Sequence, residues 1–154
     1  MDLFTFNDMT KINRTELGDE VPLELFRAIR LIGMYQGLPM EGKTTTLTVG
    51  RKIGRSIPAD TVEQFLDMFK ALKIGAMTLL EQTDSYMLFR VDDCFCSGLP
   101  VKGKKVCDLE GAILEGALKR ILSNNNLSVY ESKCNINGDD YCEYTVRKYN
   151  NIDD

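Results

Sequence analysis

The part of the sequence that most constrains the fold lies between residues 107 and 146. An apolar pattern of helical period covers residues 108–122, and two short strand-like runs follow it. The pair Asn137-Gly138 separates these two runs. Because Asn-Gly is a strong signal for a tight turn between antiparallel strands, this part of the chain predicts a helix followed by a β-hairpin.

Three cysteines and a glutamate lie where these elements join. Cys107 stands just before the helix, and Cys142 opens the second strand. Glu131 and Cys134 lie at the end of the first strand. A structural zinc site takes four ligands, and both thiolate sulfur and carboxylate oxygen can be ligands of zinc. The spacing alone leaves two alternatives open, a metal site or unligated thiols, since free cysteine is among the most buried residue types.

One geometric condition applies to a shared metal ion. In a regular strand, residues 131 and 134 point to opposite faces of the sheet. Common ligation by Glu131 and Cys134 therefore requires the strand to bend or to end near Cys134.

Three runs in this region carry a family resemblance: V-C-D-L-E-G from residue 106, V-Y-E-S-K-C from residue 129, and N-G-D-D-Y-C-E-Y from residue 137. Together they resemble the 4-vinyl reductase-type domain, a small-molecule-binding domain similar to the sensory domains of activators that respond to phenols and xylenes. The resemblance is concentrated in residues 106–146. We expect residues 1–154 to form a single domain in which residues 1–20 are an N-terminal arm.

The resemblance implies a fold shared with TRAPP vesicle-tethering subunits and heme/nitric-oxide-binding domains. It also implies a zinc ion held by Cys107, Glu131, Cys134 and Cys142, an apolar pocket for a small hydrophobic ligand, and a homodimer. The signal is expected to pass across the dimer or to a regulatory protein partner. Phenol sensors of this type bind the phenolic hydroxyl through His and Trp side chains. This chain contains neither residue, so phenol itself is not the expected ligand.

Composition excludes several other classes of protein. The chain has 154 residues, of which 44% are hydrophobic and 27% charged, as in ordinary globular domains. Its net charge of −4 argues against a nucleic-acid surface, which needs clustered Lys and Arg. No apolar run approaches a membrane span, and the first residues do not resemble a signal peptide. We therefore expect a cytoplasmic protein whose five cysteines, an odd number, stay reduced.

The N-terminal half predicts helices. Pro22 is suited to the first turn of a helix, and Leu25, Ile29 and Ile32 follow at the spacing of a core-facing stripe. Arg27 and Arg30 lie off this stripe and are interpreted as a solvated face.

Residues 37–44, G-L-P-M-E-G-K-T, match the sequence pattern G-x-x-x-x-G-K-T of phosphate-binding loops. In a nucleotide-binding loop this pattern follows a buried strand and opens a helix. Here the preceding segment is predicted to be helical, so the motif lacks its structural context and nucleotide binding is disfavoured.

The remaining segments complete an α+β fold, an antiparallel sheet of about four strands packed with helices. A helix is expected over 44–57, with Gly50 and Gly54 allowing close approach of another backbone. A second helix is expected to begin near Asp60, because Asp60 and Glu63 form a capping-box-like start. A hairpin is expected over 76–92. On the helix at 108–122, Glu115 is expected to face outward.

Cys94 and Cys96 follow the first hairpin as a C-x-C pair. This spacing is too short for an easy disulfide, and we interpret both residues as packed thiols or redox accessories rather than ligands.

Three functions remain in consideration. The first is a zinc-containing sensory domain. The second is a cysteine-based redox sensor whose oxidation releases the metal, since zinc-binding thiolates are also oxidisable. The third is a carrier of a tetrapyrrole or another hydrophobic ligand. We expect no enzyme, because the chain has no histidine and no recognisable dinucleotide-binding pattern.

Overall fold

A computed structural model describes residues 2–149. The four strands are β1 (Ala76–Gln82), β2 (Tyr86–Asp92), β3 (Leu127–Lys133) and β4 (Cys142–Lys148). The α-helices are α1 (Leu23–Arg27), α2 (Lys43–Ser56), α3 (Val62–Ala71) and α4 (Asp108–Ile121). Shorter helical segments are η1 (Phe6–Thr10), the π-helical η2 (Ala28–Tyr35) that continues α1, η3 (Pro39–Gly42) and η4 (Asn135–Asn137).

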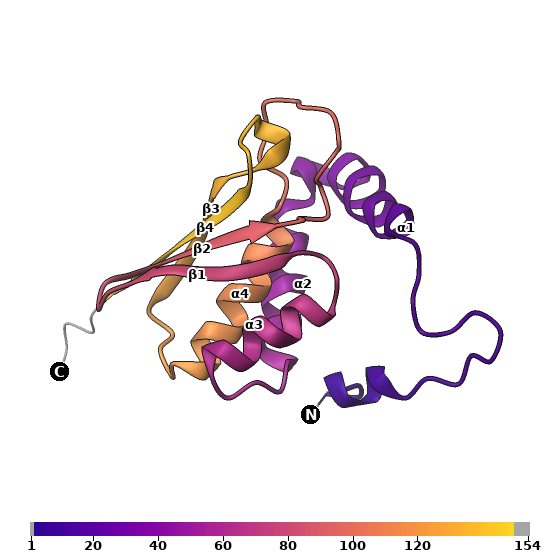
Figure 1. Cartoon of the computed structure of the whole chain (residues 1–154), viewed down its shortest axis with the longest axis horizontal. Coiled ribbons are helices and arrows are strands. Elements are labelled where there is room, and N and C mark those ends of the chain that lie inside the picture. The colour runs from indigo at the N-terminus through magenta and orange to yellow at the C-terminus, as the bar shows by residue number, and fades with distance from the viewer. Residues whose placement is uncertain (1, 150–154) are drawn as a thin grey trace.

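The strands form one antiparallel sheet in the order β1-β2-β4-β3. The α+β class and both hairpins predicted from the sequence are confirmed (Figure 1). The predicted tight turn at Asn137-Gly138 is wrong, because β3 and β4 are joined through η4. The central pair, β2 and β4, runs without a register shift. Each edge strand contains one shift, between Leu79 and Glu81 in β1 and between Glu131 and Lys133 in β3.

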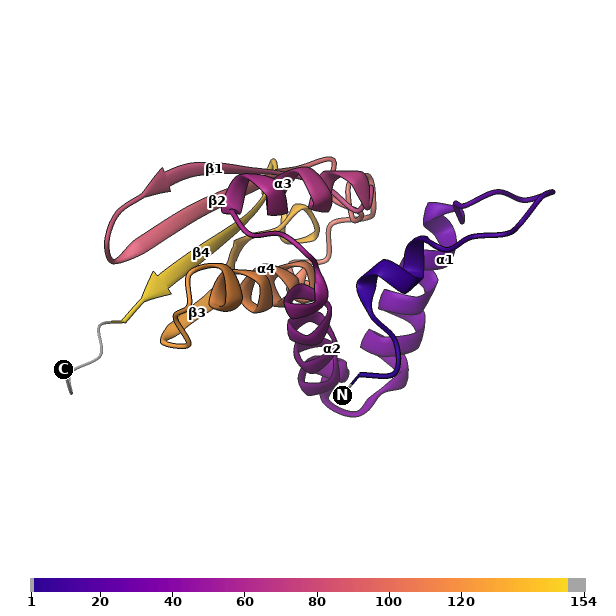
Figure 2. The same ribbon diagram turned by 90° about the horizontal axis from the view of Figure 1, so that it is seen from below.

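Helices α3 and α4 pack against one face of this sheet, α2 packs on α4, and α1 extends away from the sheet (Figure 2). The apolar stripe predicted in α3 reaches the core through Phe65 and Phe69, both fully buried. The other fully buried large side chains of the core come from β2, β4 and α4: Met87, Phe89, Val91, Leu114, Leu118, Tyr144 and Val146.

Helices α2 and α4 cross at glycines. A Cβ atom on Gly54 would lie 2.0 Å from the carbonyl oxygen of Ile113, and one on Gly116 would lie 2.2 Å from that of Arg51. The predicted close approach at Gly50 and Gly54 is confirmed, and the approaching backbone is that of α4.

The predicted orientation of the N-terminal helix is wrong. Leu25, Ile29 and Ile32 are 48%, 52% and 66% exposed, whereas Arg30 is only 3% exposed. Arg27 also turns inward, because its guanidinium donates to backbone oxygens of the loop that follows β2. The inward face is set by contacts with the loop after β2, because the Phe26 ring packs edge-on against the Phe95 ring and the Arg30 guanidinium lies over the same ring.

The G-x-x-x-x-G-K-T motif forms a corner between two helices. The π-helical η2 precedes it, and α2 begins at Lys43. Met40, Glu41 and Gly42 all have positive φ at this corner. No strand precedes the motif, so the context that a phosphate-binding loop requires is absent from this part of the described chain.

The arm at the start of the chain contacts α2 and the segment that follows α3. Asp2 pairs with Lys52 of α2 at 2.9 Å, and Glu20 pairs with Lys73 after α3 at 2.5 Å. Among residues 2–149, no helix combines the length and apolarity that a bilayer crossing requires.

Candidate metal centre and neighbouring cavities

All five cysteines of the chain meet at one end of the sheet. Cys94 and Cys96 follow β2, and Cys107 immediately precedes α4. Cys134 follows β3, and Cys142 opens β4. None of the five is more than 2% exposed, and none forms a disulfide.

The sulfur of Cys107 is the centre of this cysteine cluster. It lies 3.2 Å from the sulfur of Cys96 and 3.4 Å from that of Cys94. The sulfurs of Cys134 and Cys142 are 3.6 Å and 3.7 Å away. One short region therefore contains more sulfur donors than a single tetrahedral ion needs.

Glu131 joins the cluster through the backbone of Cys107. Both of its carboxylate oxygens accept from the Cys107 N–H, at 2.9 and 3.0 Å. The register shift after Glu131 supplies the bend that the sequence required near the end of this strand. As a result, donor atoms of Cys107, Glu131 and Cys134 lie within 4.8 Å of one another.

The structure brings all four residues of the set implied by the resemblance to this region. It also brings there Cys94 and Cys96, which the sequence interpretation had treated as packed or redox-accessory thiols and not as ligands. Donor atoms of Cys94, Cys96, Cys107 and Cys142 also lie within 4.8 Å of one another. The pairing of β2 with β4 explains this, since Val91 lies opposite Cys142. The C-x-C pair that follows β2 therefore emerges beside the start of β4, a signal that strand order would have revealed.

Proton sharing perturbs the thiols strongly. Hydrogen bonds from neighbouring thiols, that of Cys107 first, lower the pKa of Cys96 well below the usual range. Contact with Cys134 first, and then with the other thiols, raises the pKa of Cys107. Burial raises the pKa of Glu131 to about 9, the charge of Cys134 adds to this, and the Cys107 N–H opposes it.

The donor chemistry of the cluster fits a soft or borderline metal ion. Thiolates favour zinc, cuprous ions and iron over magnesium or calcium. Sulfurs around a tetrahedral zinc are about 3.8 Å apart, given a zinc–sulfur bond of about 2.3 Å. The sulfur separations of 3.2 to 3.7 Å are close to this value.

A buried ion pair, which the sequence interpretation missed, lies beside the cluster. Arg30 contacts Asp108 at 3.2 Å and Glu110 at 3.6 Å, in both cases through Nη2. Its Nε and Nη1 have no hydrogen-bond partner among the described residues, nor do the carboxylate oxygens of Glu110. Its guanidinium carbon lies 4.9 Å from the ring centroid of Phe95, between Cys94 and Cys96 in sequence.

An apolar cavity of about 450 Å³ adjoins the cysteine cluster. Val106 and Ile136, two of its lining residues, lie one and two positions from cluster cysteines. Its full lining comes from η2, the loop before α4 and η4: Leu31, Tyr35, Gln36, Leu99, Pro100, Lys102, Lys104, Val106 and Ile136. The volume falls within the range of small-molecule sites, and the lining is mainly apolar.

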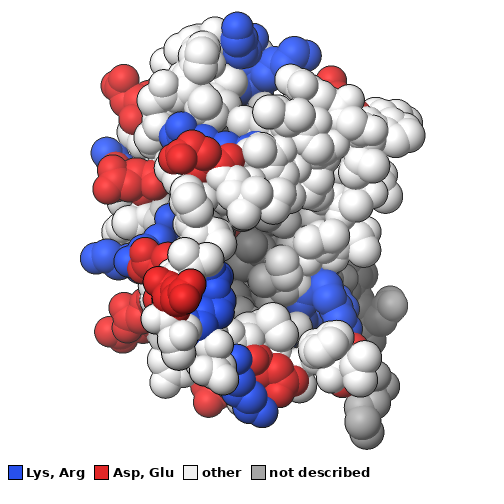
Figure 3. All heavy atoms as spheres, turned by 90° about the vertical axis from the view of Figure 1, so that its right-hand side faces the viewer, with Lys and Arg blue, Asp and Glu red and all other residues white. Residues whose placement is uncertain are grey.

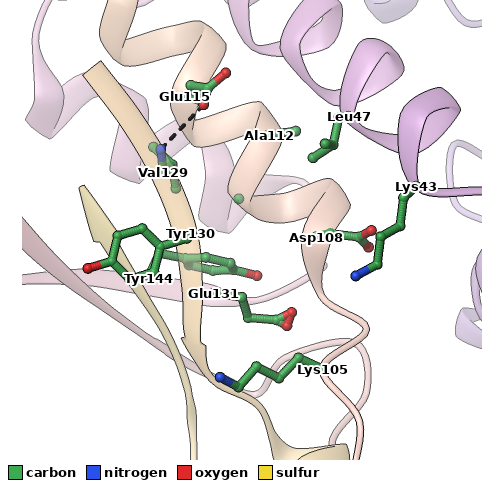
Figure 4. A pocket seen from close by; sticks show the side chains of 11 residues that line it. Lys43, Leu47, Lys105, Asp108, Ala112, Glu115, Val129, Tyr130, Glu131 and Tyr144 are labelled. Carbon is green, nitrogen blue, oxygen red and sulfur yellow. Dashed lines mark hydrogen bonds between the residues drawn. The ribbon is translucent and has the colours of Figure 1, made fainter. Parts of the chain in front are cut away.

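A second cavity, of about 280 Å³, is lined by residues of α2, α4, β3 and β4. Figure 4 shows Lys43, Asp108 and Glu131 extending toward it from α2, α4 and β3. Glu115 also lines this cavity and is 4% exposed, so the expectation that it faces outward is wrong. It is buried because Arg51 pairs with it and the Val129 N–H donates to it at 3.3 Å.

The antiparallel sheet, its one-sided cover of helices and the buried cysteine cluster define the class of α+β domain that the sequence resemblance implied. Residues 87–148 match the family model of the vinyl-4-reductase domain, so the resemblance is confirmed over this part of the chain. Two uncharacterized proteins of Methanocaldococcus jannaschii are similar. MJ0150 is 28% identical over 138 residues, covering 85% of this chain and 78% of its own. MJ1642 is 24% identical over 137 residues, covering 88% and 83%.

Three solved structures share the fold. A vinyl-4-reductase family protein from Methanocaldococcus jannaschii has a TM-score of 0.68 at 17% identity, covering 94% of this chain and 88% of that one. The phenol-responsive sensory domain of the transcription activator PoxR, solved with phenol, has a TM-score of 0.62 at 12% identity, covering 83% and 75%. A trafficking protein particle complex subunit 3 from Naegleria fowleri, covalently bound to palmitic acid, has a TM-score of 0.53 at 15% identity, covering 73% and 82%.

Proposed function

We propose that residues 1–154 form a single zinc-containing sensory domain that binds a small hydrophobic molecule and signals through a dimer or a regulatory protein partner. The match to the vinyl-4-reductase domain and the fold shared with the PoxR sensory domain support this class of function. We propose binding rather than catalysis, because the cavity of about 450 Å³ beside the cysteine cluster is lined mainly by apolar side chains.

The observation that carries the proposal is the position of the apolar cavity against the cysteine cluster. The loop before α4 lines the cavity through Leu99 and Val106, and this same loop runs between Cys96 and Cys107. A ligand that fills the cavity therefore contacts a loop held at both ends by cluster cysteines. Lys102 and Lys104 also line the cavity, so an apolar ligand with an acidic group is compatible with it.

The proposed metal ion has a structural role. The sequence resemblance assigns it to Cys107, Glu131, Cys134 and Cys142, an assignment that remains a prediction. With four protein ligands and no open position, such a site stabilises a fold rather than activating water. The chain's own residues would then hold the start of α4 against the β3–β4 hairpin, beside the cavity.

Ligand binding can be tested with N-phenyl-1-naphthylamine, an apolar fluorescent probe, and decanoate as competitor. We expect the probe to fluoresce on binding and decanoate to displace it. Leu31→Lys places a charge in the cavity and should abolish the fluorescence. Leu80→Lys is the matched control, because Leu80 lies on β1, outside the cavity lining, and is 47% exposed. Equal fluorescence in both variants would contradict a ligand site at this cavity.

The homodimer remains a proposal, which the N-terminal helix supports. Ile29, Ile32 and Met40 are 52%, 66% and 90% exposed along one stretch of chain. Figure 3 views the molecule from the side of this N-terminal region, where charged side chains gather toward one edge and a broad uncharged area remains. We propose that a second copy of the chain covers Ile29, Ile32 and Met40. Ile32→Glu should lower the molar mass found by sedimentation equilibrium, whereas Leu80→Glu should not.

A redox sensor is the second candidate function, and the short separations between the cysteine sulfurs favour it. The Cys107 sulfur has four sulfur neighbours between 3.2 and 3.7 Å away. Mild peroxide would then form a disulfide and release the metal, which thiol titration and elemental analysis detect together. If peroxide leaves both the thiol count and the metal content unchanged, this second function fails.

A further inference from the structure

The cysteine cluster contains two thiols more than the proposed zinc ion uses. A four-ligand zinc site is already complete with the set implied by the resemblance: Cys107, Glu131, Cys134 and Cys142. Cys94 and Cys96 are nevertheless buried against this set, with their sulfurs 3.4 and 3.2 Å from the sulfur of Cys107. A thiol is a weak hydrogen-bond donor and a weak acceptor, so contacts among five thiols contribute little by themselves. The position of the extra pair calls for another cause.

The donors of the cluster form two groups that share a sulfur. Within each group, all donor atoms lie within 4.8 Å of one another. One group consists of Cys107, Glu131 and Cys134, and the other of Cys94, Cys96, Cys107 and Cys142. The thiol of Cys142 also interacts with the thiol of Cys134, so it reaches the first group as well. Cys107 and Cys142 therefore lie between the two groups.

We propose that the cluster holds a second zinc ion, bound by Cys94, Cys96, Cys107 and Cys142, beside the first ion, which keeps all the ligands implied by the resemblance. The sulfurs of Cys107 and Cys142 bridge the two ions. Six donors, two of them shared, give each ion four ligands, which is the number that a structural zinc takes. This inference rests on the metal of the proposed function and adds a site to it.

The sulfur spacings of the second set fit one tetrahedral ion. The two bridging sulfurs, of Cys107 and Cys142, are 3.7 Å apart. The sulfur of Cys96 lies 3.6 Å from that of Cys142 and 3.2 Å from that of Cys107. Sulfurs around a tetrahedral zinc are about 3.8 Å apart, given a zinc–sulfur bond of about 2.3 Å. A small outward movement of these side chains is therefore sufficient to admit the ion.

The carboxylate of Glu131 can serve the first ion without losing its present contact. Both of its oxygens accept from the Cys107 N–H. A carboxylate has about four lone-pair sites, so one oxygen can keep the N–H while the other binds the metal. On the other side of the cluster, the Asn135 N–H donates to the bridging sulfur of Cys142 at 3.5 Å. A backbone donor of this kind favours the thiolate over the thiol.

The second ion also balances the charge of the second pair of thiolates. Three thiolates and a carboxylate around one divalent ion leave two negative charges in a buried place, and further unpaired charge there is costly. Ionised Cys94 and Cys96 add two negative charges, which a second divalent ion cancels. A buried cation already lies beside this pair, since the Arg30 guanidinium carbon is 4.9 Å from the ring centroid of Phe95, between the two cysteines in sequence.

The second ion ties a wall of the apolar cavity to the sheet. Its ligands come from the end of β2, the start of α4 and the start of β4. They hold both ends of the loop between Cys96 and Cys107, which lines the cavity through Leu99 and Val106. The second site therefore fixes the loop that a ligand in this cavity contacts.

The test uses the full chain, purified anaerobically, loaded with excess zinc and then desalted. Elemental analysis should find two zinc ions per chain, and X-ray absorption at the zinc edge should show a zinc neighbour within about 4 Å of each ion. One zinc per chain would overturn the second site and leave the metal of the proposed function intact. Two ions without a zinc neighbour would also overturn it. Absence of bound zinc would instead refute the metal itself, so the failures are distinguishable.

Variants then separate the two ions. The double variant Cys94→Ala, Cys96→Ala should bind one zinc, whose neighbours are three sulfurs and one oxygen. Cys134→Ala should also bind one zinc, but with four sulfur neighbours. Ser97→Ala is the matched control, because Ser97 follows Cys96 directly and is exposed, and it should keep both ions. A double variant that still binds two ions, or an oxygen neighbour in Cys134→Ala, would contradict the proposed second ligand set.

Discussion

The carboxylate of Glu131 accepts the backbone N–H of Cys107 through both oxygens, at 2.9 and 3.0 Å, and so attaches β3 to the start of α4. This contact joins residues 24 positions apart in sequence at the centre of the cysteine cluster.

Removal of this acceptor should destabilise the fold. Glu131→Ala leaves the N–H of Cys107 without a partner, and we expect a loss of about 1–3 kcal/mol in the free energy of unfolding. Glu131→Gln retains a side-chain oxygen and should lose less. Urea denaturation with and without bound metal measures both variants. Equal losses in the alanine and glutamine variants would show that the hydrogen bond contributes nothing.

Gly54 should not tolerate a side chain. Gly54→Ala places a methyl group 2.0 Å from the Ile113 carbonyl oxygen, so α2 and α4 must separate. We expect a loss of about 1–3 kcal/mol from overpacking, against the gain that alanine normally brings to a helix. Gly33→Ala is the matched control, because its nearest described neighbour, the Ala28 oxygen, is 3.6 Å away. Thermal unfolding compares the two, and similar melting temperatures would contradict the packing at Gly54.

The free energy of unfolding should decrease as the pH rises, because of the buried Glu110. Burial raises its pKa from 4.5 to about 7, although the Arg30 charge lowers it; the charges of Asp108 and Cys96 raise it further. The folded protein thus keeps a proton that the unfolded chain releases, so this contribution is complete at acidic pH and is lost as pH rises through about 7.

The variant Glu110→Gln isolates this effect. Between pH 5 and pH 8 the wild type should lose up to roughly 3 kcal/mol relative to the variant, from the size of the pKa shift. Urea unfolding of both proteins at the two pH values gives the difference. Parallel stability curves for the two proteins would show that Glu110 has an ordinary pKa.

The helix α3 should depend on Thr61. Its hydroxyl oxygen accepts from the Gln64 N–H at 3.1 Å, at the N-cap position of the helix. We expect Thr61→Ala to cost about 0.5–2 kcal/mol. Asp60→Ala should cost less, since Asp60 contacts Gln64 only through its own backbone N–H. If chemical denaturation shows a larger loss of unfolding free energy for Asp60→Ala than for Thr61→Ala, then Asp60 caps the helix, as the sequence had indicated.

The α3 start shows which details the sequence conceals. The apolar stripe of this helix was predictable, because the spacing of Phe65 and Phe69 depends only on helical period. The choice between Asp60 and Thr61 as cap was not, because adjacent residues with good capping side chains differ only in backbone conformation. The element order and the two hairpins followed from local patterns in the same way as the stripe.

Errors of burial arose where a charge is paired across the fold. Arg30 and Glu115 were expected in solvent, as single charges on helices usually are. Their partners come from distant segments: Asp108 and Glu110 for Arg30, and Arg51 for Glu115. Local sequence does not contain such pairings.

The residues of the candidate site were also predictable only where they lie in one local motif. Cys107, Glu131, Cys134 and Cys142 could be named from a motif whose parts lie close together in sequence. Cys94 and Cys96 reach the site only because β2 pairs with β4, so their position depends on strand order. The cavity beside them is formed by η2, a loop and η4, and could not be outlined from sequence.

The register shifts in β1 and β3 have a second consequence. These are the two edge strands of the sheet, and each has a shift within its own length, between Leu79 and Glu81 and between Glu131 and Lys133. An uninterrupted edge strand is a template on which further chains can add and aggregate. Since a bulge bends the strand and breaks the row of free backbone groups, both borders of this sheet are poor templates. The distortion that brings Glu131 to Cys107 thus also protects the protein against fibrillar self-association.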